Sequence, residues 1–344
     1  MRRTPAPLFT AAVVAALAAG VSAPAAADPA PGVIPGAQDI VCTAPQGASD
    51  VLNQLSGDYN ASLTDPGAPR WYVWGPQGPS PITAKAGANP ITRPSNTTGG
   101  LRALDLPGSG VDCAGAARDP QSGDQVSDDF VAFAKEAVAV AGGSRVPANL
   151  TTQNLRDLYT CNVTNWHQID PAYSDSTAKP FLPAYDSNVR AFFLKTIGGG
   201  SPVTPGSCVI QGTQENQGSD PALSDPDAIV PYSVSHYIWQ VLYGRGGGSD
   251  VPGPLTLRSI DGVAPVDTAN RRIGDAFAGT VYSHILYNVV RDADWTATDA
   301  HATALQNIFG PTGWICTSPT AAGDLQSFGL LPLQGFDCGS SIHS

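Results

Sequence analysis

The chain has 344 residues and a formal net charge of −11 at pH 7, with 18 lysines and arginines against 29 acids. This acidic balance argues against binding to nucleic acid or to anionic membranes, although one local site can still be positive. The length predicts one large or two medium domains. Glycine (37 residues) and proline (31 residues) are abundant, yet large apolar residues recur regularly, which indicates a folded chain with many loops.

The first residues are typical of a secretory signal peptide. Met1-Arg2-Arg3 is basic, residues 11–19 form a short apolar run, and Ala25-Ala26-Ala27 is a small-residue cleavage site. We expect residues 1–27 to be removed, and the loss of Arg2 and Arg3 changes the net charge from −11 to −13. Residues 28–37 are expected to be a flexible lead. No cysteine lies near the cleavage site, so we expect a secreted, extracellular protein with no lipid anchor and no membrane insertion.

The remaining chain alternates predicted strands with predicted helices. Strands are expected at 39–42, 71–74, 111–117 and 228–232, and helices at 51–60, 101–104, 155–159, 187–197 and 233–242. Residues 130–140 fit either a helix or a buried strand, as do residues 285–290. Residues 255–266 predict a hairpin that turns at Asp261-Gly262. The alternation predicts an α/β fold with mostly parallel sheets, in which ligands lie where strands end and helices begin.

Four loops have this strand-to-helix form: 43–47, 95–99, 118–121 and 185–188. In the last of them, Asp186 or Ser187 is a good N-cap for the helix that follows. The start of such a helix exposes N–H donors and the positive end of its dipole, so it can hold an anion, and Arg190 could add a charge. Many helices begin this way without a ligand.

Six cysteines in an exported chain predict three disulfides. Spacing favours Cys161 with Cys208 and Cys316 with Cys338, which leaves Cys42 with Cys113, although the sequence alone does not choose among the alternatives. The chain has no C-x-x-C pair and only five scattered histidines, which argues against a zinc site. We expect no metal and no cofactor.

Several segments resemble, in the same order, the secreted phosphate-binding-protein-like substrate-binding domains of actinobacteria. These belong with the type II periplasmic binding proteins that serve ABC phosphate importers. The segments are 39–41, 50–56, 91–96, 155–161 with Asn165-Trp166, 192–194, 214–216 and 228–233. The resemblance implies a two-lobe α/β fold with a ligand cleft between the lobes. It also implies two chain crossings, near 130–140 and 229–232. Lobe one would comprise 38–130 plus 232–344, and lobe two 131–231.

The resemblance also implies that the four loops supply the ligand-binding residues, which are Gln46, Thr97, Thr98, Arg118, Asp186, Ser187, Asn188 and Arg190. The loops depart from the family pattern: the first has lost its hydroxyls, Asp119-Pro120 stands in the third, and Asp186 and Asn188 replace glycines in the fourth. Phosphate binding requires hydrogen-bond donors, and glycine lets the backbone approach the anion. Asp186 could fill the anion site with its own carboxylate.

We therefore expect an exported solute-binding protein, monomeric, with an altered anion site, an uncertain small ligand such as phosphate, and an ABC permease as a candidate partner. The alternative is a binding-dead relative that acts as an extracellular interaction protein. Trp71, Tyr72 and Trp74 could form its contact surface, although core packing is favoured for them. An enzyme is not expected, because neither G-x-S-x-G nor H-E-x-x-H occurs. Ser233 and His236 lie close in sequence, but a catalytic triad needs spatial partners.

Overall fold

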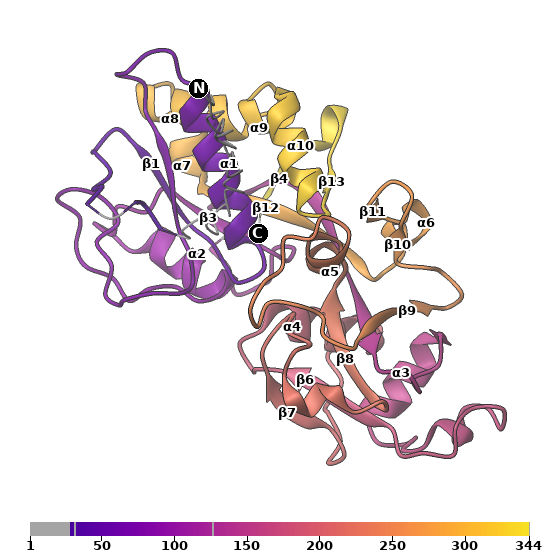
Figure 1. Ribbon diagram of the computed structural model, residues 1–344. Coiled ribbons are helices and arrows are strands. Elements are labelled where there is room, and N and C mark those ends of the chain that lie inside the picture. Colours follow the sequence, from indigo (N-terminus) through magenta and orange to yellow (C-terminus); the bar gives the residue numbers. More distant parts are fainter. Residues whose placement is uncertain (1–27, 31, 126, 344) are drawn as a thin grey trace, which may run out of the picture.

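A computed structural model describes residues 28–30, 32–125 and 127–343. The predicted signal peptide, residues 1–27, lies outside the described residues. Helices and strands gather in two lobes, as predicted (Figure 1). Among the described residues, no helix is both long and apolar enough to cross a membrane.

One twelve-stranded sheet runs through both lobes. Its main path is β2 (Trp71–Trp74), β1 (Ile40–Thr43), β3 (Cys113–Ala116), β12 (Ser283–Arg291), β4 (Asp128–Gly142), β8 (Ala228–Ser233), β6 (Lys179–Pro183) and β7 (Ile210–Thr213). The strands β2, β1 and β3 are parallel to one another, as are β8, β6 and β7. The expectation of mostly parallel pairing is wrong at the centre, because β4 runs antiparallel to both β12 and β8.

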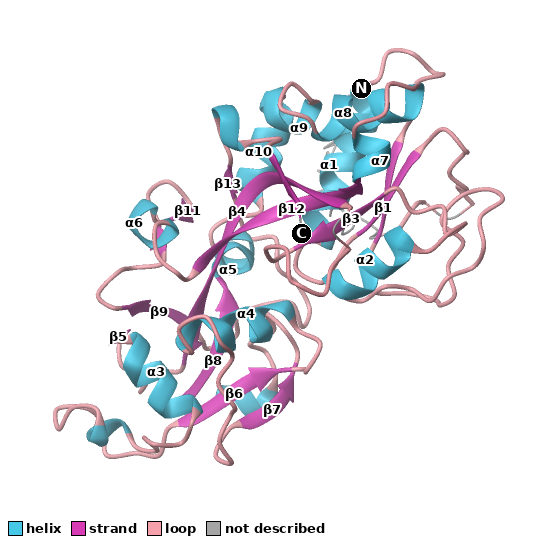
Figure 2. Cartoon of the chain, turned by 180° about the vertical axis from the view of Figure 1, so that it is seen from behind, coloured by secondary structure: helices cyan, strands magenta, loops and turns pink. Residues whose placement is uncertain are grey.

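The long strand β4 joins the lobes. Its first part pairs with β12 and its last part with β8 and β9 (Thr256–Ile260). Figure 2 shows β4 and β12 together at the junction of the lobes. All but one of the residues in β4 are buried. A strand covered on both faces loses the alternation of apolar and polar residues. This explains why its sequence fitted a helix equally well.

Short strands complete the sheet at its margins. They are β5 (Asn149–Leu150), β13 (Leu331–Pro332) and β14 (Ser341–His343). The predicted turn at Asp261-Gly262 is present, and both residues have positive φ. The predicted hairpin is only a single bridge there, between Ile260 and Val263, because β9 pairs with β4 and β5. A separate small hairpin joins β10 (Val266–Asp267) to β11 (Arg272–Ile273).

The helices cover both faces of this sheet. They are α1 (Ser49–Ser62), α2 (Thr97–Asp105), α3 (Thr152–Tyr159), α4 (Asn188–Ile197), α5 (Val234–Val241), α6 (Asp275–Ala278), α7 (Asp292–Trp295), α8 (Ala300–Phe309), α9 (Trp314–Thr317) and α10 (Pro319–Ser327). Three of the longer ones begin at side-chain caps, Thr151, Ser187 and Ser233, and Ser187 is one of the two residues predicted to cap α4. Each cap oxygen accepts a hydrogen bond from a backbone N–H of the first turn.

Each lobe has its own hydrophobic core. Residues of the N-terminal lobe's core come from 40–134 and 286–330, and those of the middle lobe's core from 137–282. The predicted lobe limits, 38–130 plus 232–344 and 131–231, stay a prediction. The residues of these cores favour a return of the chain to the N-terminal lobe at the start of β12, which is later in the sequence than the predicted residue 232.

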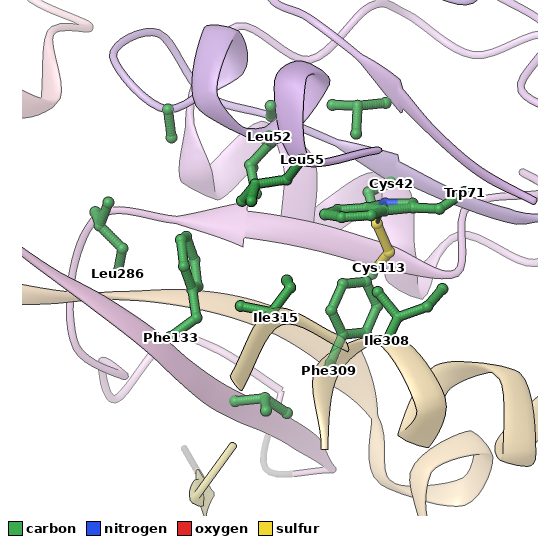
Figure 3. Packing of buried hydrophobic residues seen from close by; sticks show 14 of the residues in the cluster. Cys42, Leu52, Leu55, Trp71, Cys113, Phe133, Leu286, Ile308, Phe309 and Ile315 are labelled. Atoms are coloured by element: carbon green, nitrogen blue, oxygen red, sulfur yellow. Dashed lines mark hydrogen bonds between the residues drawn. A yellow bond between two sulfur atoms is a disulfide. The ribbon is translucent and has the colours of Figure 1, made fainter. Parts of the chain in front are cut away.

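The core of the N-terminal lobe includes the side chain of Trp71. It is fully buried, and its ring meets that of Phe309 edge to face at 5.2 Å. In Figure 3, it lies among Leu52, Leu55 and Phe309. Trp71 therefore cannot be part of a contact surface. The half-buried Tyr72 and Trp74 also pack against buried hydrophobic residues.

Three disulfides connect Cys42 with Cys113, Cys161 with Cys208, and Cys316 with Cys338. These are the pairs that the spacing favours. The first joins the neighbouring strands β1 and β3, in which the two cysteines are register partners. The other two tie loops to helix ends in the middle lobe and the N-terminal lobe.

Candidate ligand cleft between the lobes

Helix α4 begins at the junction of the lobes, and its start already holds a carboxylate. The Oγ of its cap residue, Ser187, accepts from the backbone N–H of Arg190 at 3.0 Å. The same hydroxyl donates to Oε2 of Glu215, and the backbone N–H of Val189 donates to that oxygen at 3.4 Å. Glu215 follows β7 and is buried. The anion position at this helix start is therefore occupied by the chain's own side chain.

Glu215 also lies close to the opposite lobe. Gly47 lies in the loop before α1, and a β-carbon built on it would lie 3.3 Å from Oε1 of Glu215. This Oε1 is buried and has no hydrogen-bond partner among the described residues. Burial raises the pKa of Glu215 to about 7, although the bond from Ser187 acts in the opposite direction. A carboxyl group with one unpaired buried oxygen favours its neutral form.

A second buried carboxylate, that of Glu136 on β4, lies nearby. Its Oε1 accepts from the hydroxyls of Ser233 at 2.6 Å and Ser235 at 3.2 Å, and its Oε2 lies 3.5 Å from Nε2 of His284. Burial acts to raise the pKa of Glu136. The contacts with His284 and the two serines outweigh burial and hold this pKa below its usual value. Glu136 therefore keeps its negative charge next to Glu215.

The space left between these two carboxylates is very small. The cavity has a volume of about 10 Å³, and Gln46, Gly47, Ala117, Glu136, Val138, Asn188, Val189, Glu215 and His284 line it. A volume of about 10–15 Å³ is the minimum for a single water molecule. A phosphate ion, with four oxygens around phosphorus, does not fit there without displacing Glu215.

A much larger cleft of about 690 Å³ adjoins this cavity. Its walls are the loop after β3, the helices α3 and α4, and the start of β12. The lining residues are Ala117, Arg118, Asp119, Gln121, Thr152, Gln153, Arg156, Asn188, Ala191, Phe192, Lys195, Thr196, Ile197, Gly199, Gly200, Val281, Ser283 and His284. Clefts of about 300–1,000 Å³ are the usual size for small-molecule sites.

Two of the predicted ligand residues, Arg118 and Asn188, line this cleft, and they differ in whether their side chains are already bonded within the chain. Asn188 lines both the cleft and the small cavity. Arg118 makes two bonds of 2.7 Å to the carboxylate of Asp124, so its charge is already compensated. Asp119, beside it, accepts from the phenol of Tyr287 at 2.9 Å.

Arg190 does not point into the cleft. Its Nη1 donates to the carbonyl of Pro183 at 2.9 Å and its Nη2 to the side chain of Gln211 at 2.7 Å, and its guanidinium lies 4.2 Å from the ring centre of Tyr185. The guanidinium is thus bonded within the chain, and a contact between Arg190 and a ligand stays a prediction. Its position one turn into the helix was compatible with either direction, and these three contacts decide it.

Asp186 is exposed and lines none of the cavities described here. That Asp186 fills an anion site stays a prediction, and the carboxylate that meets this helix start in the structure is that of Glu215. Thr97 is buried at the start of α2, where its Oγ1 accepts from the backbone N–H of Ala117 at 3.3 Å. Thr98 is exposed. Gln46 lines the small cavity and a second opening of about 360 Å³.

Sequence reasoning gave no role to the groups that shape this site: Glu136, Arg156, Phe192, Lys195, Glu215 and His284. Glu136 lies in the segment that could not be assigned to a strand or a helix. The other five come from elements that meet only in the folded chain. A buried strand carrying a single glutamate is the one signal that could have pointed to Glu136.

The side chains of Ser233 and His236 are not bonded to each other. Ser233 donates to Glu136, whereas Nε2 of His236 lies 2.7 Å from the carboxylate of Asp250. The hydroxyl of Ser233 accepts from the backbone N–H of His236, as a helix cap does. This arrangement lacks the serine–imidazole bond of a nucleophilic triad.

One cluster outside the cleft brings together groups that could ligate a metal ion. Asp129, Asp292 and His343 each place one ligand atom within 4.8 Å of the other two. His343 on β14 is the register partner of Asp129 on β4. Burial raises the pKa of Asp129 above its usual value. The expectation of no metal stays a prediction.

No family model and no curated protein matches the sequence. Solved structures do match. An ABC-type phosphate transport receptor from Vibrio cholerae aligns over 85% of this chain and 99% of its own, with a TM-score of 0.57 and 14% identity. This chain has the fold of a phosphate transport receptor. The predicted resemblance to phosphate-binding proteins is thus confirmed at the level of the fold.

Two further structures with the phosphate-receptor fold agree. A putative phosphate ABC transporter substrate-binding protein with bound phosphate from Clostridium perfringens covers 86% of this chain and 100% of its own, at a TM-score of 0.54 and 14% identity. PstS from Borrelia burgdorferi has the same coverage and identity at a TM-score of 0.50. At 14% identity these likenesses give the architecture, and the side chains at the junction of the lobes must decide the ligand.

Proposed function

We propose that this protein is an exported, non-catalytic solute-binding protein that does not bind free phosphate at the start of α4. The observation that carries the proposal is the bond from the cap residue Ser187 to the buried carboxylate of Glu215. In a receptor for a free anion, those donors would meet the ligand. Here they meet a side chain, while a cleft of small-molecule size remains open beside it.

Electrostatics supports the exclusion of phosphate. A phosphate ion at this helix start would lie beside Glu136, a buried carboxylate that stays charged, and would have to displace or protonate Glu215. Like charges in a poorly solvated site repel each other strongly. The guanidinium that could offset them, that of Arg190, is bonded to Pro183 and Gln211 instead.

A thermal-shift titration of residues 28–344 with inorganic phosphate tests the exclusion. A ligand present at about 100 times its dissociation constant adds ~2.7 kcal/mol to the free energy of unfolding, so binding would be visible. We expect no shift for the wild type. In the variant Glu215→Ala, which removes the charge and opens space, we expect a phosphate-dependent shift to appear. Asp186→Ala, which removes an exposed acid of the same loop, is the matched control and should not respond.

Saturable phosphate binding by the wild type would contradict the proposal. The same result would arise if the carboxylate of Glu215 turned out of the cavity in solution. A crystal structure of the phosphate-soaked protein would show which group occupies the donors of Ser187 and Val189.

We base the proposed cellular role on the predicted signal peptide and on the fold. We propose that the protein is secreted, is monomeric and delivers its solute to an ABC permease. Pull-down from the cell envelope tests the last step, because a receptor in service of an importer should recover permease components. Recovery of other surface proteins without any permease would favour the alternative role, that of an extracellular interaction protein.

A further inference from the structure

We propose that the cleft beside Glu215 binds an amphipathic organic anion, a solute with an acidic group at one end and an apolar body. This inference rests on the proposed function and specifies its ligand class. Its premises are the charge of the cleft walls, the exposed apolar side chains within it and one buried nitrogen that has no partner.

The charge of the walls is positive, in a chain of net charge −11. Arg156 at the end of α3 and Lys195 at the end of α4 both line the cleft and are exposed. Neither forms an ion pair with any residue that the structure describes. The third cation, Arg118, is bonded to Asp124, and the single lining acid, Asp119, is bonded to Tyr287. Two positive charges are therefore left for a ligand.

The second opening at the junction of the lobes has the opposite character. Its lining includes Asp50, Glu215 and Asp250 and no lysine or arginine. The second opening offers an anion no lysine or arginine, so an anion approaching the junction is attracted to the cleft of Arg156 and Lys195.

The apolar part of the ligand would contact a separate set of side chains. Val281, just before β12, is 70% exposed although it lines the cleft, Phe192 of α4 is partly exposed there, and the buried Ile197 lies behind them in the lining. Exposed large apolar groups in a concave site are typical of ligand contacts. The ring of Phe192 lies 4.4 Å from that of His284 at an interplanar angle of 42°, and Phe192 is the partly exposed ring that a flat ligand could contact.

His284 adds a polar contact between the two regions. Its side chain is only 7% exposed, and its Nε2 faces Glu136 at 3.5 Å. Its Nδ1 is buried with no hydrogen-bond partner among the described residues, and the residue lines the cleft. A neutral ring that donates from Nε2 offers Nδ1 as an acceptor for a ligand hydroxyl or amine, and a charged ring offers a donor to the anion. An unpaired buried nitrogen is costly, so this nitrogen gains from a ligand group that a small shift of the ring brings within its reach.

Isothermal titration of residues 28–344 tests the inference with paired probes. 3-Phenylpropionate and phenyl phosphate carry both features, 3-phenylpropionamide lacks the charge, and acetate and inorganic phosphate lack the apolar body. We expect the two aromatic anions to bind and the other three to bind at least tenfold more weakly. The two aromatic anions differ in their acidic group, so their relative affinity tells carboxylate from phosphate ester.

Variants then locate the site. Arg156→Gln and Lys195→Gln should each weaken binding of the aromatic anion by about tenfold, the effect of losing one charge-assisted contact. Phe192→Ala should weaken the aromatic anion and leave the weak binding of acetate unchanged. Arg102→Gln is the matched control, since Arg102 is an exposed residue of α2 that lies outside the cleft lining. The melting temperature of each unliganded variant shows whether it is folded.

Equal binding of the amide and the carboxylate would overturn the anionic ligand class while leaving a solute-binding protein. Failure of both aromatic anions to bind, or binding that the cleft variants do not weaken, would overturn the inference altogether. The proposed function fails by a different result, the stabilisation of the wild type by inorganic phosphate.

Discussion

The difference in free energy of unfolding between the Glu215→Gln variant and the wild type should favour the variant more at pH 8 than at pH 5. Glutamine keeps the shape of the side chain and an oxygen that can accept from Ser187, and it removes the charge. The wild-type carboxyl group is buried, and its pKa rises from the usual 4.5 to about 7 on folding. The folded protein therefore binds a proton more tightly at this position than the unfolded chain does.

The sign and size follow from this difference. Because the folded pKa lies above the unfolded one, the free energy of unfolding falls as the pH rises from about 4.5 to about 7. Each unit of pKa difference corresponds to about 1.4 kcal/mol, so the wild type loses roughly 3 kcal/mol across this window. Glutamine does not titrate, and the loss should be absent from the variant.

Urea denaturation at pH 5, 6, 7 and 8 measures the effect as the difference between variant and wild type. Asp128 and Asp324 also have raised pKa values, of about 7, but their contributions occur in both proteins and cancel. The exposed Asp186→Asn variant serves as control and should give a flat difference. A flat difference for Glu215→Gln would refute the reasoning, because the carboxylate would then be as well solvated in the folded protein as in the unfolded chain.

Three further results are expected. Trp71→Ala should lower the free energy of unfolding by about 3–5 kcal/mol in urea denaturation, because it leaves a cavity in a fully buried site against Phe309. A loss below about 1 kcal/mol would place the indole at the surface. Arg190→Ala should lower the free energy of unfolding by about 2 kcal/mol, because it loses the bonds to Pro183 and Gln211. It should leave the affinity for an aromatic anion unchanged, since Arg190 lies outside the cleft. Weakened binding without loss of stability would show that Arg190 faces the ligand. Replacing Cys161 and Cys208 with alanine should lower the free energy of unfolding by about 2–4 kcal/mol under non-reducing conditions. An unchanged denaturation midpoint would show that this disulfide does not form.

The sequence by itself determined the features that depend on a few neighbouring residues. The cap residues Thr151, Ser187 and Ser233 each accept from a backbone N–H three residues later, so these contacts depend on local spacing alone, and Ser187 was one of two candidates for α4. The turn at Asp261-Gly262 is equally local, because both residues tolerate positive φ. The alternation of such elements was enough for an α/β fold, and the resemblance to phosphate-binding proteins implied its two lobes.

Only the tertiary structure decided where β4 belongs and what its side chains meet. A strand covered on both faces has no period, so nothing in residues 128–142 distinguished it from a helix. Its single glutamate, Glu136, meets hydroxyl groups as far as 99 residues away in the chain.

The same holds for the occupant of the anion position. The departure of the fourth loop from the phosphate-binding pattern was visible in the sequence, and it suggested that a carboxylate could stand in place of a ligand. The nearest acid, Asp186, was the natural choice, yet Glu215 comes from 28 residues beyond Ser187. Which side chain contacts a helix start depends on the positions of strands and loops that lie far apart in the sequence, so it is fixed only by the whole fold.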